Sequence, residues 1–206
     1  MKYNGIAFFD LDETITSKDT LLEFIKFVVG KRYFWFGIIV LSPLIVLFLL
    51  KIYPSEKLKE NFFSFYLKRH TEKELLQKGK EFCNTIMPQI VYPKALEKIE
   101  WFKSENYRII IITASSSIWL GEWCKQQNVE ISATEFEVKN LPDGQAGGRY
   151  YTGKIAGKNN YGKEKAVRVK KILAEGNYPI SYGYGDSKAD LHFMELTDES
   201  ELGSFA

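Results

Sequence analysis

The sequence predicts an α/β fold in which a doubly wound, Rossmann-like parallel sheet forms the core and a helical cap follows the first strand. Two short apolar runs, residues 6–9 and 108–112, are typical of strands buried on both faces of a parallel sheet. Between them apolar residues recur at helical spacing, and after them strands alternate with helices. We therefore assign residues 1–16 and 89–206 to the core and residues 17–88 to the cap.

Length and composition describe an ordinary globular protein. The 206 residues leave room for one core domain and a modest insertion, with 45% apolar and 26% charged residues. A net charge of +2 without a basic run predicts no nucleic-acid partner. Cys83 and Cys124 lack metal-ligand spacing and are expected to be reduced, buried thiols. We expect no signal peptide, because the first apolar run is short and leads into carboxylates, so the predicted location is cytoplasmic.

The cap is predicted to be helical throughout. Residues 17–30 carry apolar side chains at helical spacing. Pro54 and Ser55 resemble a fresh helix start, with apolar positions continuing to residue 66. Thr71 with Glu74 three residues later is a capping-box pattern, which predicts a helix that continues to residue 88.

The core elements follow in alternation. Helices are predicted over residues 93–105, 117–127 and 164–174, and strands over residues 131–134 and 180–184, the second being the last strand. Residues 135–140 and 149–155 are predicted to pair as a hairpin across a turn that contains Gly147 and Gly148. The order of elements excludes a dinucleotide loop at these two glycines.

An uncharged run of eighteen residues begins at Tyr33 and ends at Leu50. Its length is that of a membrane helix, but a single crossing would separate two strands of one sheet. Pro43 permits a bent or broken helix instead. Three alternatives stay open: a helical pair buried in the cap, an element that enters one leaflet at the inner face of the cytoplasmic membrane, or an interface between two copies of the chain.

Two carboxylates, Asp10 and Asp12, and the hydroxyl of Thr14 follow the first strand. Open α/β sheets carry their chemistry at the carboxyl ends of strands, and side chains two apart on an extended strand face the same side. A buried pair of carboxylates is costly unless a cation or a shared proton relieves the repulsion. This pattern favours a catalytic site over solvated acids at a strand end.

Three later segments add chemistry suited to a phosphate. Thr113 ends the second strand and leads into a helix start, where a hydroxyl and main-chain amides can donate to an anion. A lysine at the next helix start, Lys163 or Lys165, would neutralise a phosphate. Asp186 and Asp190 follow the last strand and offer the oxygen ligands that a hard divalent cation prefers.

Together these segments resemble the haloacid dehalogenase superfamily. The shared motifs are, in order, Asp10-x-Asp12-x-Thr14, Thr113, a helix-start lysine, and Gly185-Asp186-Ser187-x-x-Asp190. The resemblance spans residues 6–190 and is nearest to subfamily I, whose helical C1 cap lies between the first two motifs and which includes phosphoserine phosphatase. Residues 152–165 further resemble the IB branch that contains a bacterial phosphatidylglycerophosphatase of the inner membrane.

The resemblance implies a role for each matching residue. Asp10 attacks phosphorus and becomes an aspartyl-phosphate, and Asp12 protonates the leaving oxygen and then activates water. Thr113 binds the phosphoryl oxygens. Mg²⁺ is held by Asp10, by the main-chain carbonyl of Asp12 and by Asp186.

The same resemblance favours Lys165 over Lys163 as the catalytic lysine, because the branch places it just before the apolar part of its helix. Asp190 is expected to support the metal or the lysine, and the supporting motif positions are Thr14, Gly185 and Ser187. Asp19 and Ser115 are candidates for contacting the substrate. For Asp19 the alternative is a helix-start acid that the helix dipole favours.

Other features carry no predicted chemistry. His70 and His192 have no partner at metal spacing and are expected to be structural or exposed. Only sixteen residues follow Asp190, whereas members of the superfamily commonly continue with another strand and helix. We therefore expect either a sheet that is short at that edge or a trimmed chain.

The expected function is that of a Mg²⁺-dependent phosphomonoester hydrolase that acts on a phosphorylated small molecule or on a lipid phosphate such as phosphatidylglycerophosphate. One alternative is a phosphatase or phosphotransferase for a small soluble ester such as phosphoserine. Another is a membrane-associated binding protein that has kept the fold without turnover. The second acid, Asp12, argues against dehalogenase chemistry, which has no leaving group to protonate.

Overall fold

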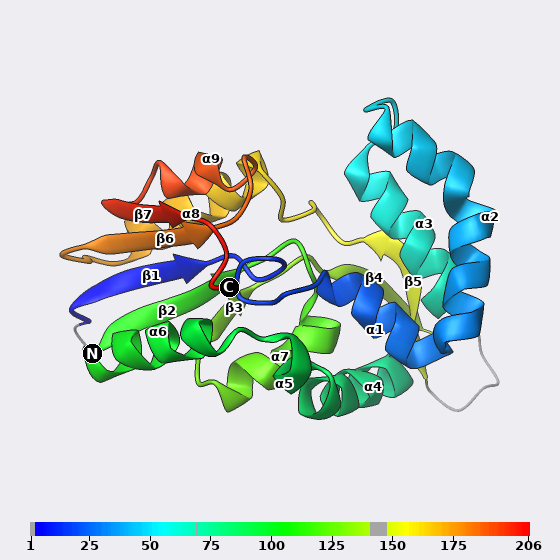
Figure 1. Ribbon diagram of the computed structural model, residues 1–206, viewed down its shortest axis with the longest axis horizontal. Helices are drawn as coiled ribbons and strands as arrows, with labels where there is room; N and C mark the ends of the chain where they lie inside the picture. Colours follow the sequence, from blue (N-terminus) through cyan, green and yellow to red (C-terminus); the bar gives the residue numbers. More distant parts are fainter. Residues whose placement is uncertain (1–2, 69, 141–147) are drawn as a thin grey trace.

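A computed structural model describes residues 3–68, 70–140 and 148–206 of the chain. Its core is a parallel sheet of five strands in the order β3-β2-β1-β6-β7. These strands are β1 (Gly5–Phe9), β2 (Tyr107–Ile112), β3 (Glu130–Ser132), β6 (Ser181–Gly185) and β7 (Glu199–Leu202). Helices cover both faces, and a helical insertion after β1 stands at the end toward which the strands point (Figure 1). The predicted α/β fold with a cap is confirmed.

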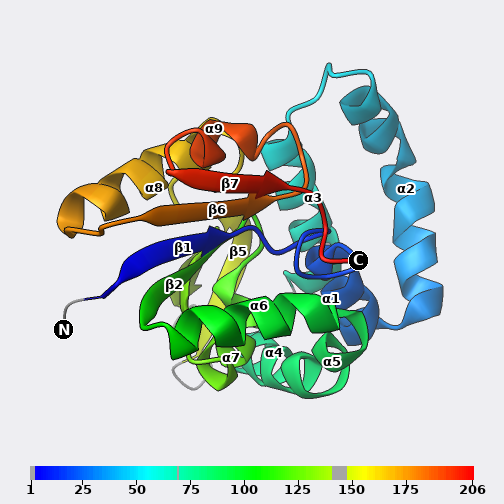
Figure 2. The ribbon, with the colours of Figure 1, turned by 60° about the vertical axis from the view of Figure 1, so that its left-hand side comes forward.

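Among the described residues, four helices belong to the core. They are α6 (Pro93–Ser104), α7 (Ser117–Gln126), α8 (Lys163–Glu175) and α9 (Leu191–Met194). The helices α8 and α9 lie on one face of the sheet, and α6 and α7 lie on the other (Figures 1 and 2). The three longer ones agree with the predicted helices to within two residues at each end.

Strand β1 is buried along its whole length because each of its faces contacts a separate apolar cluster. Ile6 and Phe8 contact the cluster that includes α8 and α9, whereas Ala7 and Phe9 contact the larger cluster on the opposite face. The parallel register of β1 with β2 and β6 brings the carboxyl ends of all three strands to one edge. The segments that follow these strands therefore meet at that edge.

In the part of the cap that the structure describes, there are four longer helices and one short one. They are α1 (Thr20–Val29), α2 (Lys31–Leu49), α3 (Ser55–Leu67), α4 (Glu72–Thr85) and α5 (Met87–Ile90). The capping box is confirmed, because Thr71 accepts a hydrogen bond from the Glu74 amide and the Glu74 side chain accepts one from the Thr71 amide. Both cysteines are buried and free, as expected.

The uncharged run forms one continuous helix, α2, and not the buried helical pair that Pro43 would permit. Proline removes the amide that would bond the carbonyl four residues earlier. Here the Ser42 hydroxyl donates to the Ile39 carbonyl at 2.8 Å and satisfies it. Only Phe34, Gly37 and Leu41 of this helix are buried. Figures 1 and 2 both place α2 on the outer side of the cap.

The predicted hairpin is present as β4 (Phe136–Asn140) and β5 (Arg149–Ile155), which pair antiparallel. Residues 141–147 of its predicted turn lie outside the described residues. The hairpin packs against the cap, since the rings of Phe63 and Phe136 stack with centroids 3.8 Å apart. The cap and the core therefore share one apolar cluster.

The prediction that residues 180–184 form the last strand is wrong, and the first of the two alternatives for that edge, a short sheet, is not what the structure shows. Strand β7 adds a fifth strand beside β6. It consists of exposed residues only, two of them glutamates, so its sequence has no apolar alternation to signal a strand. Charged residues on an edge strand also oppose pairing with another chain. Beyond it, the Phe205 ring packs 6.1 Å from that of Phe9.

Candidate active site

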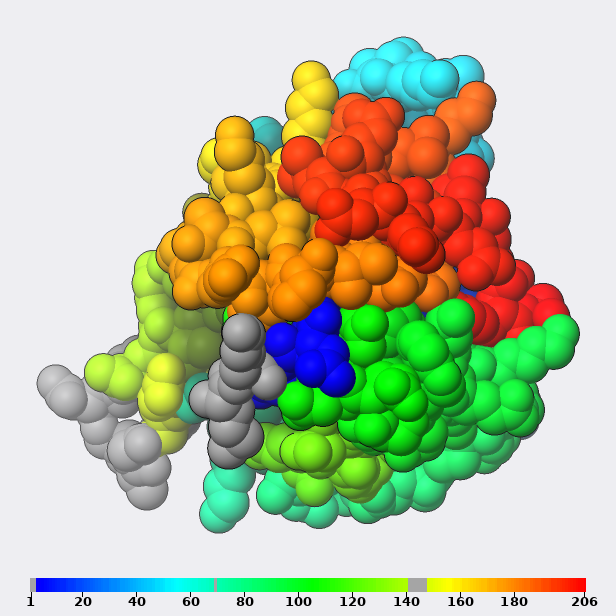
Figure 3. Space-filling model, turned by 90° about the vertical axis from the view of Figure 1, so that its left-hand side faces the viewer, coloured from blue at the N-terminus to red at the C-terminus, as the bar shows by residue number. Residues whose placement is uncertain are grey.

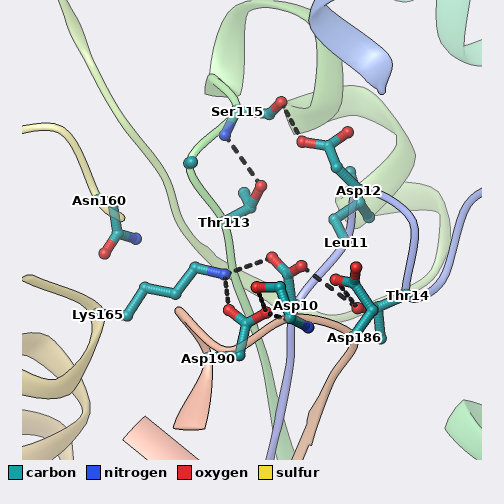
Figure 4. Close-up of polar contacts among 12 residues, drawn as sticks. Asp10, Leu11, Asp12, Thr14, Thr113, Ser115, Asn160, Lys165, Asp186 and Asp190 are labelled. Atoms are coloured by element: carbon teal, nitrogen blue, oxygen red, sulfur yellow. Dashed lines mark hydrogen bonds and ion pairs between the residues drawn. The ribbon is translucent and has the colours of Figure 1, made fainter. Parts of the chain in front are cut away.

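Polar side chains that are distant in the sequence meet at the carboxyl ends of β1, β2 and β6 (Figure 4). Asp10 comes directly after β1, and Thr113 directly after β2. Asp186 and Asp190 come from the segment after β6, and Lys165 from the first turn of α8. The crossovers of the parallel sheet thus gather the predicted residues into one place.

Asp10 and Asp190 share the ammonium group of Lys165. The Lys165 Nζ lies 2.5 Å from Asp10 Oδ1 and 2.6 Å from Asp190 Oδ1. All three side chains are buried. Burial lowers the pKa of Lys165, but Asp10 and Asp190 raise it by more, so the lysine keeps its charge.

The pKa of Asp10 is raised to about 7. Burial is the main cause and Lys165 opposes it, while the nearby charges of Asp190 and Asp12 raise the pKa further. A carboxylate that must attack phosphorus has to be ionised. An additional positive charge beside Asp10 would lower its pKa and favour the ionised form.

The structure brings Lys165, and not Lys163, into the site. Lys163 begins α8 as an exposed residue, whereas Lys165 is 2% exposed. Gly162, which precedes the helix, has a φ of 56° in the left-handed region that glycine adopts most easily. This turn sets the direction in which α8 leaves the loop and places its third residue beside Asp10.

Carboxylate oxygens of Asp10, Asp186 and Asp190 all lie within 4.8 Å of one another. The Asp190 oxygens already accept from Lys165 and from the Ser187 hydroxyl, at 2.6 and 2.7 Å. The Thr14 hydroxyl lies between the other two acids, 3.3 Å from Asp10 and 3.0 Å from Asp186. Three carboxylates share a single ammonium group here, and such a cluster of oxygen ligands with excess negative charge fits a hard cation such as Mg²⁺.

The carboxylate of Asp12 lies outside that cluster. It accepts a hydrogen bond from the Ser115 hydroxyl at 2.6 Å and one from the Thr20 amide at 2.7 Å. These two donors fix the orientation of a half-buried side chain. A contribution of Asp12 to the cation would therefore come from its main-chain carbonyl, as the resemblance implies.

The loop after β2 is held in place by its own hydroxyls. The Thr113 hydroxyl accepts from the Ser115 amide at 3.0 Å, and the Thr113 amide donates to the Ser132 carbonyl. Ser115 also accepts from the hydroxyl of Thr20 at the start of α1. One hydrogen-bond network therefore joins the loop, the second acid and the first cap helix.

Gly185 and Ser187 shape the turn after β6. The Ser187 amide and hydroxyl both donate to Asp190, at 3.2 and 2.7 Å. A side chain at position 185 would place its Cβ 2.5 Å from the Asp190 Cβ, so only glycine allows this close approach. These two residues therefore position Asp190.

Asp19 caps α1 by accepting from the Leu22 amide at 2.9 Å, which agrees with its helix-start interpretation. Its pKa is raised to about 6, by burial first and then by the charge of Asp12. Asp19 also lines a groove between α1, α2 and α3. Its candidacy as a substrate contact therefore stays a prediction.

Lys59 of α3 is a functional candidate that the sequence analysis did not identify. Its Nζ donates to the Ala114 carbonyl at 2.6 Å and to the Asn159 side chain at 2.9 Å. Burial lowers its pKa to about 8, although Asp12 and Asp19 oppose the shift. The sequence did contain a signal for Lys59, because apolar residues follow it at positions three, four and seven, which is the spacing of one helix face. The structure shows that this face is buried.

Other residues lie away from this site. The Nδ1 of His70 contacts the Leu67 carbonyl in the cap, and His192 lies on α9. A groove of about 490 Å³, lined in part by Tyr107 and Arg108, is at the start of β2. Figure 3 shows this end of the molecule, opposite the cap, where the start of β1 is surrounded by other segments. The chemistry-bearing residues lie at the other end of the strands.

Comparisons with known proteins agree with this geometry. A family model described as haloacid dehalogenase-like hydrolase matches residues 7–195. Protein CicA of Caulobacter vibrioides is 23% identical over 191 residues, which cover 93% of this chain and 82% of that protein. A solved structure of a protein of unknown function from Bordetella pertussis Tohama I has a TM-score of 0.78 at 22% identity and covers 95% of this chain and 87% of that one. A phospho-aspartyl intermediate analogue of phosphoserine phosphatase has a TM-score of 0.63 at 15% identity, covering 97% and 93%. The fold is therefore close to that of phosphoserine phosphatases.

Proposed function

This chain belongs to the haloacid dehalogenase-like hydrolase family, and from that premise we propose that it is a Mg²⁺-dependent phosphomonoester hydrolase with Asp10 as its nucleophile. The observation that carries the proposal is the contact of Lys165 with Asp10 and Asp190, beside an oxygen cluster that fits a divalent cation. Lys165 and the cation together would let an anionic carboxylate approach an anionic ester. When bound, Mg²⁺ supplies positive charge that orients the phosphoryl oxygens and neutralises them.

In the first step, an Asp10 carboxylate oxygen forms a bond to phosphorus while the bond between phosphorus and the ester oxygen breaks. The Asp12 carboxyl gives its proton to the departing oxygen. The hydrogen bonds from Ser115 and the Thr20 amide hold Asp12 in a fixed orientation for this transfer. The products of this step are an alcohol and a phosphorylated Asp10.

In the second step, a water oxygen bonds to phosphorus and the bond to the Asp10 oxygen breaks. The Asp12 carboxylate takes a proton from that water, which restores both acids to their starting states. Lys165 stabilises the returning charge on Asp10, because its ammonium lies 2.5 Å from Asp10 Oδ1. One difficult displacement is thereby divided into two easier ones.

We further propose that the substrate is a lipid phosphate, such as phosphatidylglycerophosphate. Within the described residues, α2 is the one helix long and apolar enough to cross a membrane, on length and composition alone. The helices on either side of it, α1 and α3, contact each other, so a crossing would pull them apart. Lying along the inner face of the cytoplasmic membrane keeps that contact, and Lys31, Arg32 and Lys51, which flank the uncharged run of residues 33–50, can meet anionic headgroups.

The test is phosphate release from a panel of small and lipid phosphomonoesters, with Mg²⁺ and with chelator. We expect release that requires Mg²⁺, is abolished by Asp10→Asn, and needs a higher Mg²⁺ concentration in Asp186→Ala. Turnover in excess chelator, or turnover like that of the native chain by Asp10→Asn, would overturn the proposal. Preferential transfer of phosphate to an added alcohol would instead identify a phosphotransferase.

A further inference from the structure

A groove of about 410 Å³ runs between α1, α2 and α3 in the cap. Its lining is mostly apolar and includes Leu21, Leu22, Ile38, Ile45, Leu58 and Phe62. This volume lies within the range of pockets that bind small organic molecules. An apolar groove of this size has no role in covering a small polar ester, so it needs an explanation of its own.

One end of the groove is polar and adjoins the active site. Asp19 and Lys59 belong to its lining. The Lys59 ammonium also donates to the Ala114 carbonyl, and Ala114 lies between Thr113 and Ser115 in the loop that contacts Asp12. The polar end of the groove therefore lies beside the loop that contacts Asp12, the acid that would protonate the leaving group.

The ammonium group of Lys59 is suited to meet a substrate there. It has three N–H donors, and the described contacts use two, with the Ala114 carbonyl and the Asn159 side chain. The remaining donor can bind an oxygen near the phosphate of a bound ester. The polar end pairs the Lys59 ammonium with the acid Asp19, and the free donor of Lys59 together with the apolar side chains elsewhere matches an amphiphile whose anionic head enters the active site.

We propose that this groove binds the apolar chain of the phosphomonoester whose phosphorus Asp10 attacks, with Lys59 at the junction between chain and phosphate. The inference rests on the proposed function for the place of the phosphate. It assigns the substrate class, a phosphate monoester on an aliphatic chain, to residues of the cap and not to the open outer face of α2. In this proposal, one protein molecule in solution binds the aliphatic chain of the substrate without a bilayer.

The experiment measures binding of alkyl phosphonates, from ethyl to dodecyl, which keep the head group but cannot be hydrolysed. Calorimetry with Mg²⁺ present, below the concentration at which the ligands aggregate, gives each affinity. Burial of methylene groups predicts an affinity that rises roughly two- to fourfold for each methylene and then levels off when the groove is full. A flat series in the native chain would overturn the proposal.

A matched pair of variants tests where the alkyl chain of the ligand binds. Ile45→Trp fills the groove, whereas Ile39→Trp makes the same change on the same helix at a residue that is 72% exposed and outside the groove. We expect Ile45→Trp to weaken decyl phosphonate about tenfold or more while ethyl phosphonate is unchanged, and Ile39→Trp to change neither. Leu58→Trp, on α3, is the second groove-filling variant should Ile45→Trp fail to fold.

The outcomes separate this inference from the proposed function. Equal effects of Ile45→Trp and Ile39→Trp on phosphonate affinity would mean that the alkyl chain of the ligand binds at the outer surface of α2, either with lipid or between two copies of the protein. That result would overturn the groove as the binding site. Hydrolysis of short esters with a flat phosphonate series would keep the proposed function and reject the groove. A rising series that only Ile45→Trp abolishes, in a chain that releases no phosphate from any ester, would support the groove and reject the proposed function.

Discussion

At the scale of single residues, the site depends on how one ammonium group is divided between two acids. Lys165 contacts Asp10 and Asp190 at nearly equal distances, and all three are buried. Removing one partner of a buried ion pair leaves an uncompensated charge, which is far more costly than losing a surface pair. Lys165 therefore serves both the chemistry of Asp10 and the stability of the strand ends.

Replacing Lys165 and Lys163 separately tests this assignment. Lys165→Met should lower kcat by about a thousandfold or more, because the attacking acid loses its cation in a buried site. Lys163→Met, at an exposed helix start two residues earlier, should leave kcat within about twofold and stability within ~0.5 kcal/mol. Steady-state kinetics measures kcat of both variants, and circular dichroism verifies that each variant is folded. Equal losses in the two variants would contradict the assignment.

Asp19 offers a test through pH. Its pKa is raised from 3.8 to about 6, chiefly by burial, so the folded state binds more protons than the unfolded state between these values. Its contribution to stability is therefore lost as pH rises through that window. Asp19→Asn keeps a helix cap without the charge, and near pH 7 without metal it should be more stable than the native chain by on the order of 1 kcal/mol.

The measurement is denaturant unfolding of both proteins at several pH values. Asp19→Ala is the control, because it removes the cap and should cost about 1 kcal/mol. Parallel pH profiles for the native chain and Asp19→Asn would show that Asp19 is not buried as a charge.

Residues of the site differ in how readily the sequence reveals them. Asp10, Thr113 and Asp186 each come directly after a strand of the parallel sheet, so their meeting at one edge follows from that sheet. Lys59 could not be placed in this way. Its partners, Ala114 and Asn159, are 55 and 100 residues away, and the contact depends on how the cap sits on the core.

At the scale of elements, the packing of helices decides what a local pattern becomes. The helix α2 stays continuous through Pro43 because a neighbouring serine satisfies the freed carbonyl. Its approach to α3 is close, since a Cβ at Gly37 would overlap the Tyr66 ring. Neither contact is visible in hydropathy, which is why an unbroken helix and a broken one were both compatible with the sequence.

Two helical glycines show the same dependence on packing. An added Cβ at Gly79 of α4 would clash with the Ile118 carbonyl, whereas at Gly121 of α7 the nearest atom is 4.0 Å away. Gly79→Ala should therefore destabilise the protein by about 2 kcal/mol or more, although alanine favours helix. Gly121→Ala should stabilise it by about 0.5–1 kcal/mol. Thermal unfolding measures both, and a stabilising Gly79→Ala would disprove the close contact between α4 and α7.

At the scale of the whole molecule, the cap and the core are held together by contacts on both sides of the active site. Thr20 bonds Ser115, Lys59 bonds Ala114, and Phe63 stacks on Phe136. With the cap in this position Asp10 is only 6% exposed. The outer face of that cap is α2, whose exposed apolar side chains include Trp35, Phe36, Ile39, Val46 and Leu49.

This outer face should bind an anionic membrane surface. Ile39 and Val46 lie seven residues apart on one side of α2 and are 72% and 53% exposed. Burying such side chains contributes up to about 1.5–3 kcal/mol each, and the flanking basic residues add about 1 kcal/mol per charge. The native chain should therefore float with anionic vesicles, and Ile39→Asp/Val46→Asp should lower the bound fraction at least about tenfold.

The control is Trp101→Asp/Val167→Asp, which removes two apolar residues that are 46% and 59% exposed on the core and should leave binding unchanged. Hydrolysis of a short ester should be the same in all three proteins, because neither pair of substitutions touches the residues around Asp10. If the native chain stays unbound and instead sediments as a dimer that Ile39→Asp/Val46→Asp dissociates, then α2 pairs two copies of the chain. A lipid substrate would in that case have to reach Asp10 by some path other than docking of α2 on a bilayer.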